Sequence, residues 1–388
     1  METSSVSRPG SLSVQRIRSV SLRGPLHSAP VGTISLAIGE PSFDTPNVIR
    51  DAMLKALASG ATHYCDQFGL MPLRETIASD ERRSRRRSIT VDDVLVTHGA
   101  SAGLAAVILG VVNPGDVVAI EDPTYSLYAD LVAFAGGTVT TFRRNQNGEL
   151  DADSLHDAVR SARLVIVCQP SNPTGAILSS SDWGLIVEAT RINQSLILSD
   201  EAYASLIYDG NAFTSILDVP GLETRGILCQ TFSKKFAMTG WRVGYLLGPS
   251  ELIAAASVVH RTFNGSVNTA VQYAAITAIS DAQPDASRML MEYAERRVVM
   301  EDALSSVSGL EARTPAGAFY FHCRYADSRD STGLSRAATA AGVLVRPGRE
   351  FGPAGEGHIR LSFAAAPEDI WEGIRRLSSV LDMSTERE

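Results

Sequence analysis

The chain has 388 residues, 44% of them hydrophobic and 20% charged, and its formal net charge is −8 with a pI near 5.5. Because polyanions are bound by an excess of Lys and Arg, this charge argues against nucleic acids and anionic membranes as partners. The longest apolar stretch, Gly103 to Val112, is far shorter than the ~20 residues that span a bilayer, and the length predicts two domains.

Residues 1–33 are expected to form a flexible N-terminal arm. The segment is rich in Ser and Arg and lacks hydrophobic periodicity, so it buries too little apolar surface to order itself. The same composition suits a partner-wrapping segment, and an organellar transit peptide is the alternative. The cysteines, at positions 65, 168, 229 and 323, form no close pair, which predicts reduced thiols, no metal site and a cytoplasmic location.

Residues 34–280 are predicted to form a large α/β domain. From Asp92 onward, short β-branched runs alternate with longer helical periods, which is the pattern of strands joined by crossover helices. The expected strands are Val94–Thr97, Val117–Ile120, Val139–Phe142, Leu164–Cys168, Leu196–Ser199, Gly226–Gln230 and Val243–Leu247. The expected helices are Ala102–Val112, Ser126–Ala135, Ser154–Ser161 and Ser180–Ile192. Most strands are apolar throughout, which predicts a seven-stranded, mostly parallel sheet flanked by helices.

Residues 281–388 are predicted to form a smaller α+β domain. A charged helix over 284–305 leads into strands near 318–321 and 358–363, followed by a closing helix from 367 to about 381. A change of composition near residue 280 marks the hinge. The first residues after the arm are expected to pack with this small domain.

Polar residues follow three of the apolar strands, at the sheet edge where open α/β folds bind ligands. Asn172 follows the fourth expected strand, Asp200 and Tyr203 follow the fifth, and Lys234 and Arg242 follow the sixth. Pyridoxal phosphate needs a lysine for a Schiff base, a carboxylate for its ring nitrogen, donors for its ring oxygen and a cation for its phosphate. The sequence therefore predicts this cofactor, with Lys234, Asp200, Asn172 with Tyr203, and Arg242 in those roles.

The phosphate also needs backbone N–H groups at a helix N-terminus. Gly99, Ala100 and Ser101 lie between the first expected strand and the helix expected near residue 102. Ser101, the backbone of Ala100, and Thr231 or Ser233 are the candidate phosphate donors. The spacing of the glycines in this turn is not a dinucleotide fingerprint, so a nicotinamide enzyme loses its main support.

Further motifs occur in a definite order along the chain. They are Gly39-Glu40-Pro41-Ser42, Tyr64 with Gly69, Leu73 and Arg74, Asn113-Pro114-Gly115-Asp116, Asp122-Pro123-Thr124-Tyr125, Asn172-Pro173-Thr174-Gly175, Asp200-Glu201-Ala202-Tyr203, and Ser233-Lys234 with Thr239-Gly240-Trp241-Arg242. The ordered set resembles the class I/II aminotransferase family, the aspartate aminotransferase-like group, from about residue 34 to the C-terminus. Each tetrapeptide alone is a weak signal, whereas the order is specific. The pattern departs mildly at Thr231, where serine is usual, and at Ser42, where aspartate is frequent.

The resemblance implies a fold-type I pyridoxal-phosphate transferase and further site residues. Tyr125 matches the aromatic on the face of the pyridine ring. Tyr64 matches a tyrosine that reaches the phosphate of the neighbouring subunit, which implies a homodimer with shared active sites. Arg360 matches the arginine that binds the substrate α-carboxylate, with the backbone of Gly39 beside it.

The implied function is a pyridoxal-phosphate-dependent aminotransferase (EC 2.6.1) that moves the amino group of an L-amino acid to a 2-oxo acid by a ping-pong mechanism. Lys234, Asp200 and Tyr203 are the expected catalytic residues, with Lys234 as the general base. The alternative is another pyridoxal-dependent reaction, an elimination, cyclisation or oxidation in specialised biosynthesis. A ligand sensor fused to a DNA-binding module is not expected, because only the short arm precedes the fold.

The sequence leaves the amino donor and the acceptor open. A dicarboxylate-specific enzyme needs a second cation for the distal carboxylate. Arg261, Arg346 and Arg349 are present, but nothing in the sequence places any of them in the pocket. Aromatic and aliphatic donors therefore remain alternatives.

Overall fold

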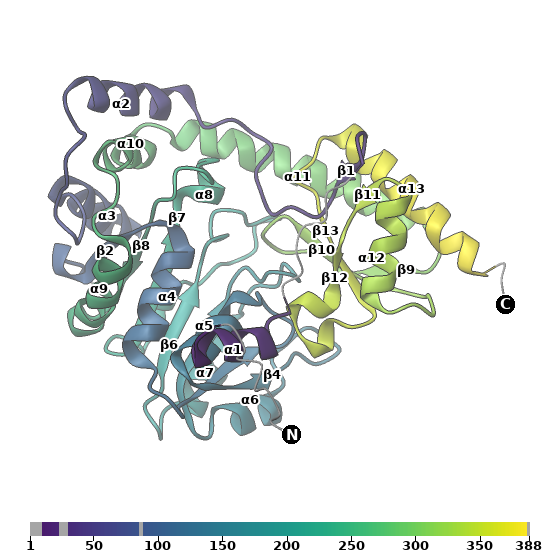
Figure 1. Ribbon diagram of the computed structural model, residues 1–388, viewed down its shortest axis with the longest axis horizontal. Helices are drawn as coiled ribbons and strands as arrows, with labels where there is room; N and C mark the ends of the chain where they lie inside the picture. The colour runs from purple at the N-terminus through teal and green to yellow at the C-terminus, as the bar shows by residue number, and fades with distance from the viewer. Residues whose placement is uncertain (1–9, 23–29, 85–87, 386–388) are drawn as a thin grey trace, which may run out of the picture.

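The computed structural model describes residues 10–22, 30–84 and 88–385, and a seven-stranded sheet forms its centre (Figure 1). The strand order is β2-β8-β7-β6-β5-β3-β4; β8 runs antiparallel to both neighbours, and the other adjacent pairs are parallel. The strands are β2 (Val94–Thr97), β3 (Val117–Glu121), β4 (Thr138–Phe142), β5 (Ala162–Cys168), β6 (Leu196–Asp200), β7 (Gly226–Thr231) and β8 (Gly244–Leu247). The predicted mostly parallel sheet is confirmed.

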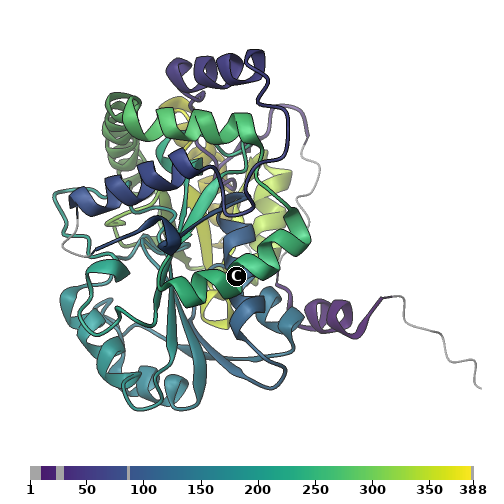
Figure 2. The ribbon, with the colours of Figure 1, turned by 90° about the vertical axis from the view of Figure 1, so that its left-hand side faces the viewer.

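Helices cover both faces of this sheet (Figures 1 and 2). One hydrophobic cluster joins the sheet to α4, α5 and α9, and another joins it to α3, α6, α7 and α10, with α2 packed on α10. The helices are α2 (Asn47–Ala58), α3 (Met71–Ser84), α4 (Gly99–Val111), α5 (Leu127–Ala135), α6 (Ala152–Val159), α7 (Ser180–Ala189), α8 (Phe232–Lys235), α9 (Ser250–Asn264) and α10 (Thr269–Ser280). Because the inner strands are apolar on both sides, each face requires such a layer.

A smaller domain contains the C-terminal quarter of the chain together with β1, and α11 connects it to the large domain (Figure 1). Its antiparallel sheet has the order β12-β13-β10-β9, and β1 pairs in parallel with β11. These elements enclose a separate hydrophobic core. The elements are β1 (Ile34–Ser35), α11 (Gln283–Ser305), β9 (Leu310–Ala312), β10 (Tyr320–Tyr325), α12 (Ser331–Ala340), β11 (Val343–Leu344), β12 (Arg346–Pro347), β13 (His358–Ser362) and α13 (Pro367–Thr385).

Part of the expected irregular arm is helical. Helix α1 (Leu12–Val20) lies beside α5 (Figure 2), capped by the side chain of Ser11. Arg16 Nε donates to the backbone oxygen of Ala133 at 2.9 Å. The helix has no fully buried residue, which is why hydrophobic periodicity does not reveal it. Residues 1–9 and 23–29 of the arm lie outside the described residues.

Three further findings concern the described parts of the chain. Short 3-10 turns join several elements: η1 (Val91–Asp93), η2 (Ile216–Asp218), η3 (Gly348–Phe351) and η4 (Pro353–Gly355). Within the described ranges, no helix combines the length and the apolar character that a membrane crossing requires. These ranges also contain no cluster of three or more side chains suited to hold a metal ion.

Candidate active site

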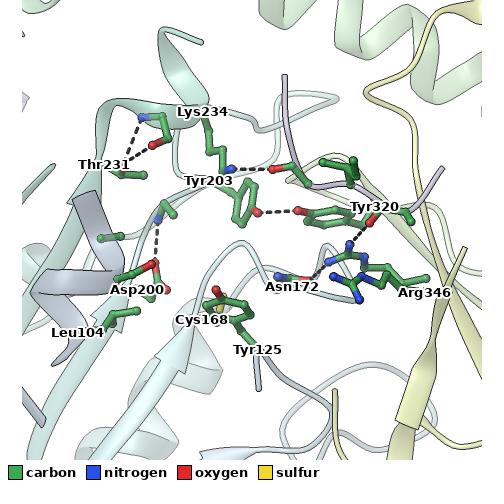
Figure 3. A pocket seen from close by; sticks show the side chains of 18 of the residues that line it. Leu104, Tyr125, Cys168, Asn172, Asp200, Tyr203, Thr231, Lys234, Tyr320 and Arg346 are labelled. Carbon is green, nitrogen blue, oxygen red and sulfur yellow. Dashed lines mark hydrogen bonds between the residues drawn. The ribbon is translucent and has the colours of Figure 1, made fainter. Parts of the chain in front are cut away.

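The carboxyl ends of β5, β6 and β7 border a cavity of about 270 Å³ that residues of both domains line (Figure 3). This volume is close to the ~300 Å³ at the lower end of small-molecule sites. All of the predicted site residues except Tyr64 line the cavity: Gly39, Ala100, Ser101, Tyr125, Asn172, Asp200, Tyr203, Thr231, Ser233, Lys234, Arg242 and Arg360. Folding therefore brings together groups that are spread over more than 300 positions of the sequence.

Asp200 ends β6 and is held by two hydrogen bonds. Its Oδ2 accepts from the hydroxyl of Tyr128 at 2.8 Å, and its Oδ1 accepts from the backbone N–H of Ala202 at 3.2 Å. Burial raises the pKa of Asp200, whereas these two bonds and the charge of Lys234 oppose the rise. A carboxylate in such surroundings favours a positively charged group beside it, such as a protonated ring nitrogen.

Lys234 lies in α8, directly after β7, and its Nζ donates to the backbone oxygen of Gly39 at 2.7 Å. Burial lowers the pKa of Lys234 to about 8. Position 39 requires glycine because Tyr320 lies close to its backbone: a Cβ there would be 1.9 Å from the hydroxyl oxygen of Tyr320. The amine is therefore close to half unprotonated near pH 8, as a nucleophile or a general base requires.

Tyr203 and Tyr320 meet across the boundary between the domains, with their hydroxyl oxygens 2.7 Å apart. Burial raises the pKa of both phenols, so both keep their protons at neutral pH. One hydroxyl can donate to the other, which leaves one proton for an oxygen atom of a ligand. Tyr203 also packs edge-on against Phe319, with ring centroids 5.4 Å apart.

Arg360, on β13, joins the small domain to the cavity wall. Its Nη1 donates to Asn172 Oδ1 at 2.9 Å, and its Nη2 donates to the backbone oxygen of Ala37 at 2.5 Å. Because arginine can only donate, the Asn172 atom facing it is the oxygen, and the Asn172 amide N–H groups are left for another acceptor. Arg360 is 5% exposed, and its Nε has no hydrogen-bond partner among the described residues. A buried, incompletely bonded guanidinium suits a carboxylate ligand.

The N-terminus of α4 forms the opposite end of the site. The helix begins at Gly99 rather than near residue 102, so Gly99, Ala100 and Ser101 form its first turn, where backbone N–H groups have no partner within the helix. Glycine has a poor helix propensity, which is why the sequence predicted that this helix would begin later, near residue 102. A Cβ on Gly99, which has φ 74°, would lie 2.9 Å from Arg242 Nη2. Glycine thus lets the guanidinium approach an anion site.

The remaining candidate phosphate donors form a pair at the end of β7. The hydroxyl oxygen of Thr231 lies 2.9 Å from that of Ser233 and also accepts from the Ser233 backbone N–H at 3.1 Å. Both side chains are buried. Together with Arg242 and the α4 terminus, they supply the charge and the donors that a phosphate group needs. The residues present therefore fit pyridoxal phosphate.

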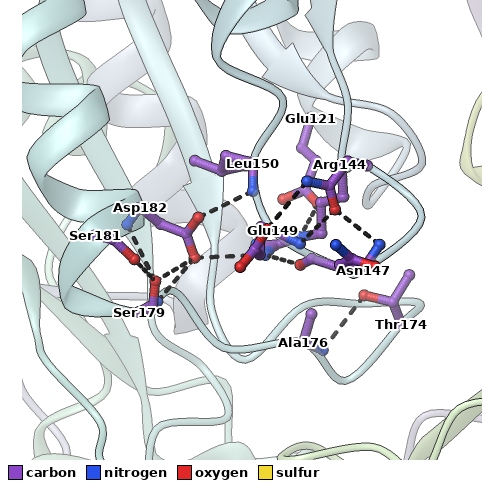
Figure 4. A network of polar contacts seen from close by, with 12 residues as sticks. Glu121, Arg144, Asn147, Glu149, Leu150, Thr174, Ala176, Ser179, Ser181 and Asp182 are labelled. Carbon is purple, nitrogen blue, oxygen red and sulfur yellow. Dashed lines mark hydrogen bonds and ion pairs between the residues drawn. The ribbon is translucent and has the colours of Figure 1, made fainter.

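The turn that carries Asn172 is supported from outside the cavity. The backbone N–H of Ala176 donates to Thr174 Oγ1 at 3.3 Å. A polar network lies beside this turn, in which Arg144 pairs with Glu121 at 2.7 Å (Figure 4). Glu121 is the last residue of β3. Through Arg144, which also pairs with Asp182 at 3.8 Å, the network joins the end of β3 to α7, the helix that follows this turn.

Tyr64 lies away from the cavity and is 98% exposed. It belongs to the segment between α2 and α3, which is held against the start of α10 because Thr269 Oγ1 donates to the backbone oxygen of His63 at 2.6 Å. Tyr125 lines the cavity and meets Tyr128 edge-on, with ring centroids 5.6 Å apart.

Sequence reasoning missed two residues that shape the site, Tyr128 and Tyr320, and it named Arg346 without placing it in the cavity. Tyr128 lies on the apolar helix α5, where an aromatic residue is usually a packing residue. Tyr320 lies on β10, which pairs with the more distant strand β13, and Arg346 lies on β12, which has only two residues. The one available signal was the spacing of Tyr125 and Tyr128, which places both on one side of a helical turn.

Comparison with known proteins agrees with this geometry. The family model described as aminotransferase class I and II matches residues 31–377. Aromatic-amino-acid aminotransferase 2 of Thermococcus litoralis is 36% identical, over 90% of this chain and 92% of the relative. The aspartate aminotransferase of Pyrococcus horikoshii is 34% identical, over 90% of each chain. The crystal structure of the aromatic aminotransferase from Pyrococcus horikoshii OT3 has a TM-score of 0.89 at 33% identity, covering 96% of this chain and 99% of that one.

Proposed function

This chain belongs to the class I and II aminotransferases, which depend on pyridoxal phosphate, and on that premise we propose which residues carry the transfer of an amino group from an amino acid to a 2-oxo acid. The observation that carries the assignment is the convergence of one amine, one carboxylate and one incompletely bonded arginine on a single cavity. These groups are Lys234, Asp200 and Arg360. No feature of the site favours elimination, cyclisation or oxidation over transfer.

One set of residues would hold the cofactor. When bound, pyridoxal phosphate supplies an aldehyde that joins an amine and a ring that accepts electrons from a breaking bond at Cα. Asp200 would hold the ring nitrogen in its protonated form, and Asn172 and Tyr203 would donate to the ring oxygen. Tyr125 would cover a ring face. The phosphate would be bound by Ala100, Ser101, Thr231, Ser233 and Arg242.

Lys234 would move the proton at the substrate Cα. Its lowered pKa of about 8 keeps part of the amine unprotonated at neutral pH, as a general base requires. Arg360 would orient the substrate by binding its α-carboxylate, with the Gly39 backbone beside it. Because donor and acceptor would use the same site in turn, a ping-pong rate law follows.

Replacing the amine tests this assignment. Lys234→Ala should lower kcat for transfer by roughly 10²-fold or more, because general-base catalysis contributes on the order of 10²- to 10⁴-fold. Lys235→Ala is the matched control, since the adjacent Lys235 does not line the cavity. Steady-state transfer rates with a panel of amino acids give the comparison. Equal losses in the two variants, or full turnover by Lys234→Ala, would show that the assignment is wrong.

We also infer a cytoplasmic homodimer. The unpaired state of all four cysteines suits a reducing compartment. Large apolar side chains are exposed on α9 and α10, among them Val258, Phe263 and Tyr273, and a second copy of the chain would cover such surfaces. The exposed Tyr64 would then reach the phosphate in the site of the second copy. Light scattering of the purified enzyme measures the oligomeric state.

A further inference from the structure

Two arginines stand opposite each other at one end of the cavity. Arg346 on β12 is paired with Arg360 on β13 across an antiparallel ladder, and both residues line the cavity. Figure 3 shows Arg346 at the end of the cavity where Asn172 and Tyr320 lie. Like charges directly opposite each other on paired strands are destabilising. Burial lowers the pKa of Arg360, Tyr320, Tyr203 and Glu350 oppose this shift, and the charge of Arg346 adds to it. The charges of Arg346 and Arg360 therefore repel each other at a place where a bound anion would reduce the repulsion.

The charge of Arg346 is only partly compensated. Its Nη1 donates to Glu350 Oε2 at 3.0 Å, and Glu350 is the one hydrogen-bond partner of the Arg346 guanidinium among the described residues. The Arg346 side chain is 25% exposed. Arg346 lines the cavity, whereas Glu350 is not among the lining residues. The remaining N–H groups of the guanidinium fork are left to bind a ligand.

Arg346 is the one charged residue of the cavity lining that has no role in the proposed function. The cavity is lined by one acid, Asp200, and by four bases, Lys234, Arg242, Arg346 and Arg360. The proposed function uses every one of these groups except Arg346. The surplus cation lies at the end of the site that would hold the substrate carboxylate, not at the phosphate end.

We propose that Arg346 is a specificity-determining residue that binds the distal carboxylate of a dicarboxylic amino acid or 2-oxo acid. The inference rests on the proposed function, in which Arg360 binds the α-carboxylate. A substrate with an aromatic or aliphatic side chain would leave the cation without an anion. A substrate with a cationic side chain would be repelled by Arg346, because Glu350 does not line the cavity. The second carboxylate thus gives Arg346 a partner of opposite charge within the cavity.

Acceptor selectivity of the holoenzyme tests the proposal. With one amino donor, kcat/KM is measured for 2-oxoglutarate, a dicarboxylate, and for pyruvate and phenylpyruvate, which have one carboxylate. The wild-type enzyme should prefer 2-oxoglutarate. Arg346→Gln should lower kcat/KM for 2-oxoglutarate by roughly 10- to 100-fold, mainly through KM, and change the other two by less than about threefold. Arg346→Lys should retain part of the preference, because it keeps the charge.

Arg349→Gln is the matched control, since Arg349 is more exposed and does not line the cavity. It should leave the selectivity unchanged. An equal loss on all three acceptors after Arg346→Gln would overturn the proposal, because Arg346 would then serve the α-carboxylate or the fold. Unchanged selectivity, or a wild-type preference for an acceptor with one carboxylate, would overturn it as well.

A binding measurement separates this proposal from the proposed function. Calorimetric titration of the holoenzyme with succinate and with propionate compares a dicarboxylate with a monocarboxylate without any turnover. Arg346→Gln should weaken succinate binding by roughly 10- to 100-fold and leave propionate binding unchanged. Selective succinate binding in a protein that transfers no amino group would contradict the proposed function alone. Transfer without this selectivity would contradict the specificity proposal alone.

Discussion

Asp200 depends on Tyr128 for its ionisation. The Tyr128 hydroxyl is fully buried, and both burial and the charge of Asp200 raise the pKa of Tyr128, so it remains a hydrogen-bond donor at neutral pH. Its bond to Asp200 lowers the pKa of a carboxyl that burial raises. The sequence predicted the carboxylate from its place after a strand. It did not predict the tyrosine, because nothing local distinguishes a buried hydroxyl donor from a packing aromatic.

Tyr128→Phe should weaken cofactor binding and transfer. A hydrogen bond to a charged group is worth about 1.5–3 kcal/mol, so the cofactor Kd should rise by roughly 10- to 100-fold, with a fall in kcat. Fluorescence titration of the apoprotein gives Kd. Tyr208→Phe is the control, since it removes a buried hydroxyl bonded at 2.6 Å to the backbone oxygen of Ala318, outside the cavity lining. A cofactor Kd that changes equally in both variants would contradict the role given to Tyr128.

The lowered pKa of Lys234 sets a pH dependence. The neutral amine attacks an aldehyde and the ammonium form does not, so covalent capture of pyridoxal phosphate by the apoprotein should accelerate as pH rises toward 8. Above about pH 8 the rate should level off. The rate is measured by quenching with borohydride at intervals. N-acetyl-lysine amide, as a model amine, should continue to accelerate toward pH 10, and the same behaviour in the protein would contradict a lowered pKa.

At the scale of elements, long strands were predictable and short ones were not. Six of the seven large-domain strands carry an apolar run that the sequence displays, and the edge strand β4 shows β-branched residues instead. Strands β1, β11 and β12 have two residues each, too few to show a period. The position of Arg346 follows from its pairing with β13. For this reason the sequence could name Arg346 as a candidate second cation but could not place it in the cavity.

The start of β8 fixes the first turn of α4. A Cβ on Gly244 would lie 2.5 Å from the backbone oxygen of Gln230 and 3.1 Å from the carbonyl carbon of Gly99. Gly244→Ala should therefore lower the free energy of unfolding by about 1–3 kcal/mol and weaken cofactor binding at the displaced helix end. Urea denaturation and cofactor titration measure the two effects. Gly240→Ala, where a Cβ meets no atom within 4 Å, should change neither, and equal effects at both positions would contradict the packing argument.

For the whole molecule, the sequence indicated two layers of helices around a sheet but not the strand order. Hydrophobic periodicity reports that a strand is buried, whereas the order β2-β8-β7-β6-β5-β3-β4 depends on pairing between distant segments. The same reason explains why α1 was missed: it lies against α5, and the hydrogen bond from Arg16 to Ala133 bridges more than 100 positions of the chain. The candidate site was easier to predict, because strand ends that carry polar residues meet at one edge of a parallel sheet.

Subunit mixing tests the shared active site. Tyr64→Ala should bind the cofactor more weakly, and Lys234→Ala should be inactive. A heterodimer of the two variants has one site with both native residues, so a mixture refolded at equal concentrations should recover about a quarter of wild-type activity at limiting cofactor. Activity no higher than the mean of the two separate variants would show that Tyr64 does not serve the second subunit's site.

The most direct measurement is to locate the covalent bond between protein and cofactor. The chain contains three lysines, Lys55, Lys234 and Lys235, so peptide mapping can distinguish every side-chain amine. Holoenzyme is reduced with borohydride, digested and analysed by mass spectrometry. We expect the pyridoxyl group on Lys234, in a ratio close to one per chain. A pyridoxyl group on Lys55 or Lys235, or an unmodified Lys234 peptide from cofactor-loaded protein, would contradict the account.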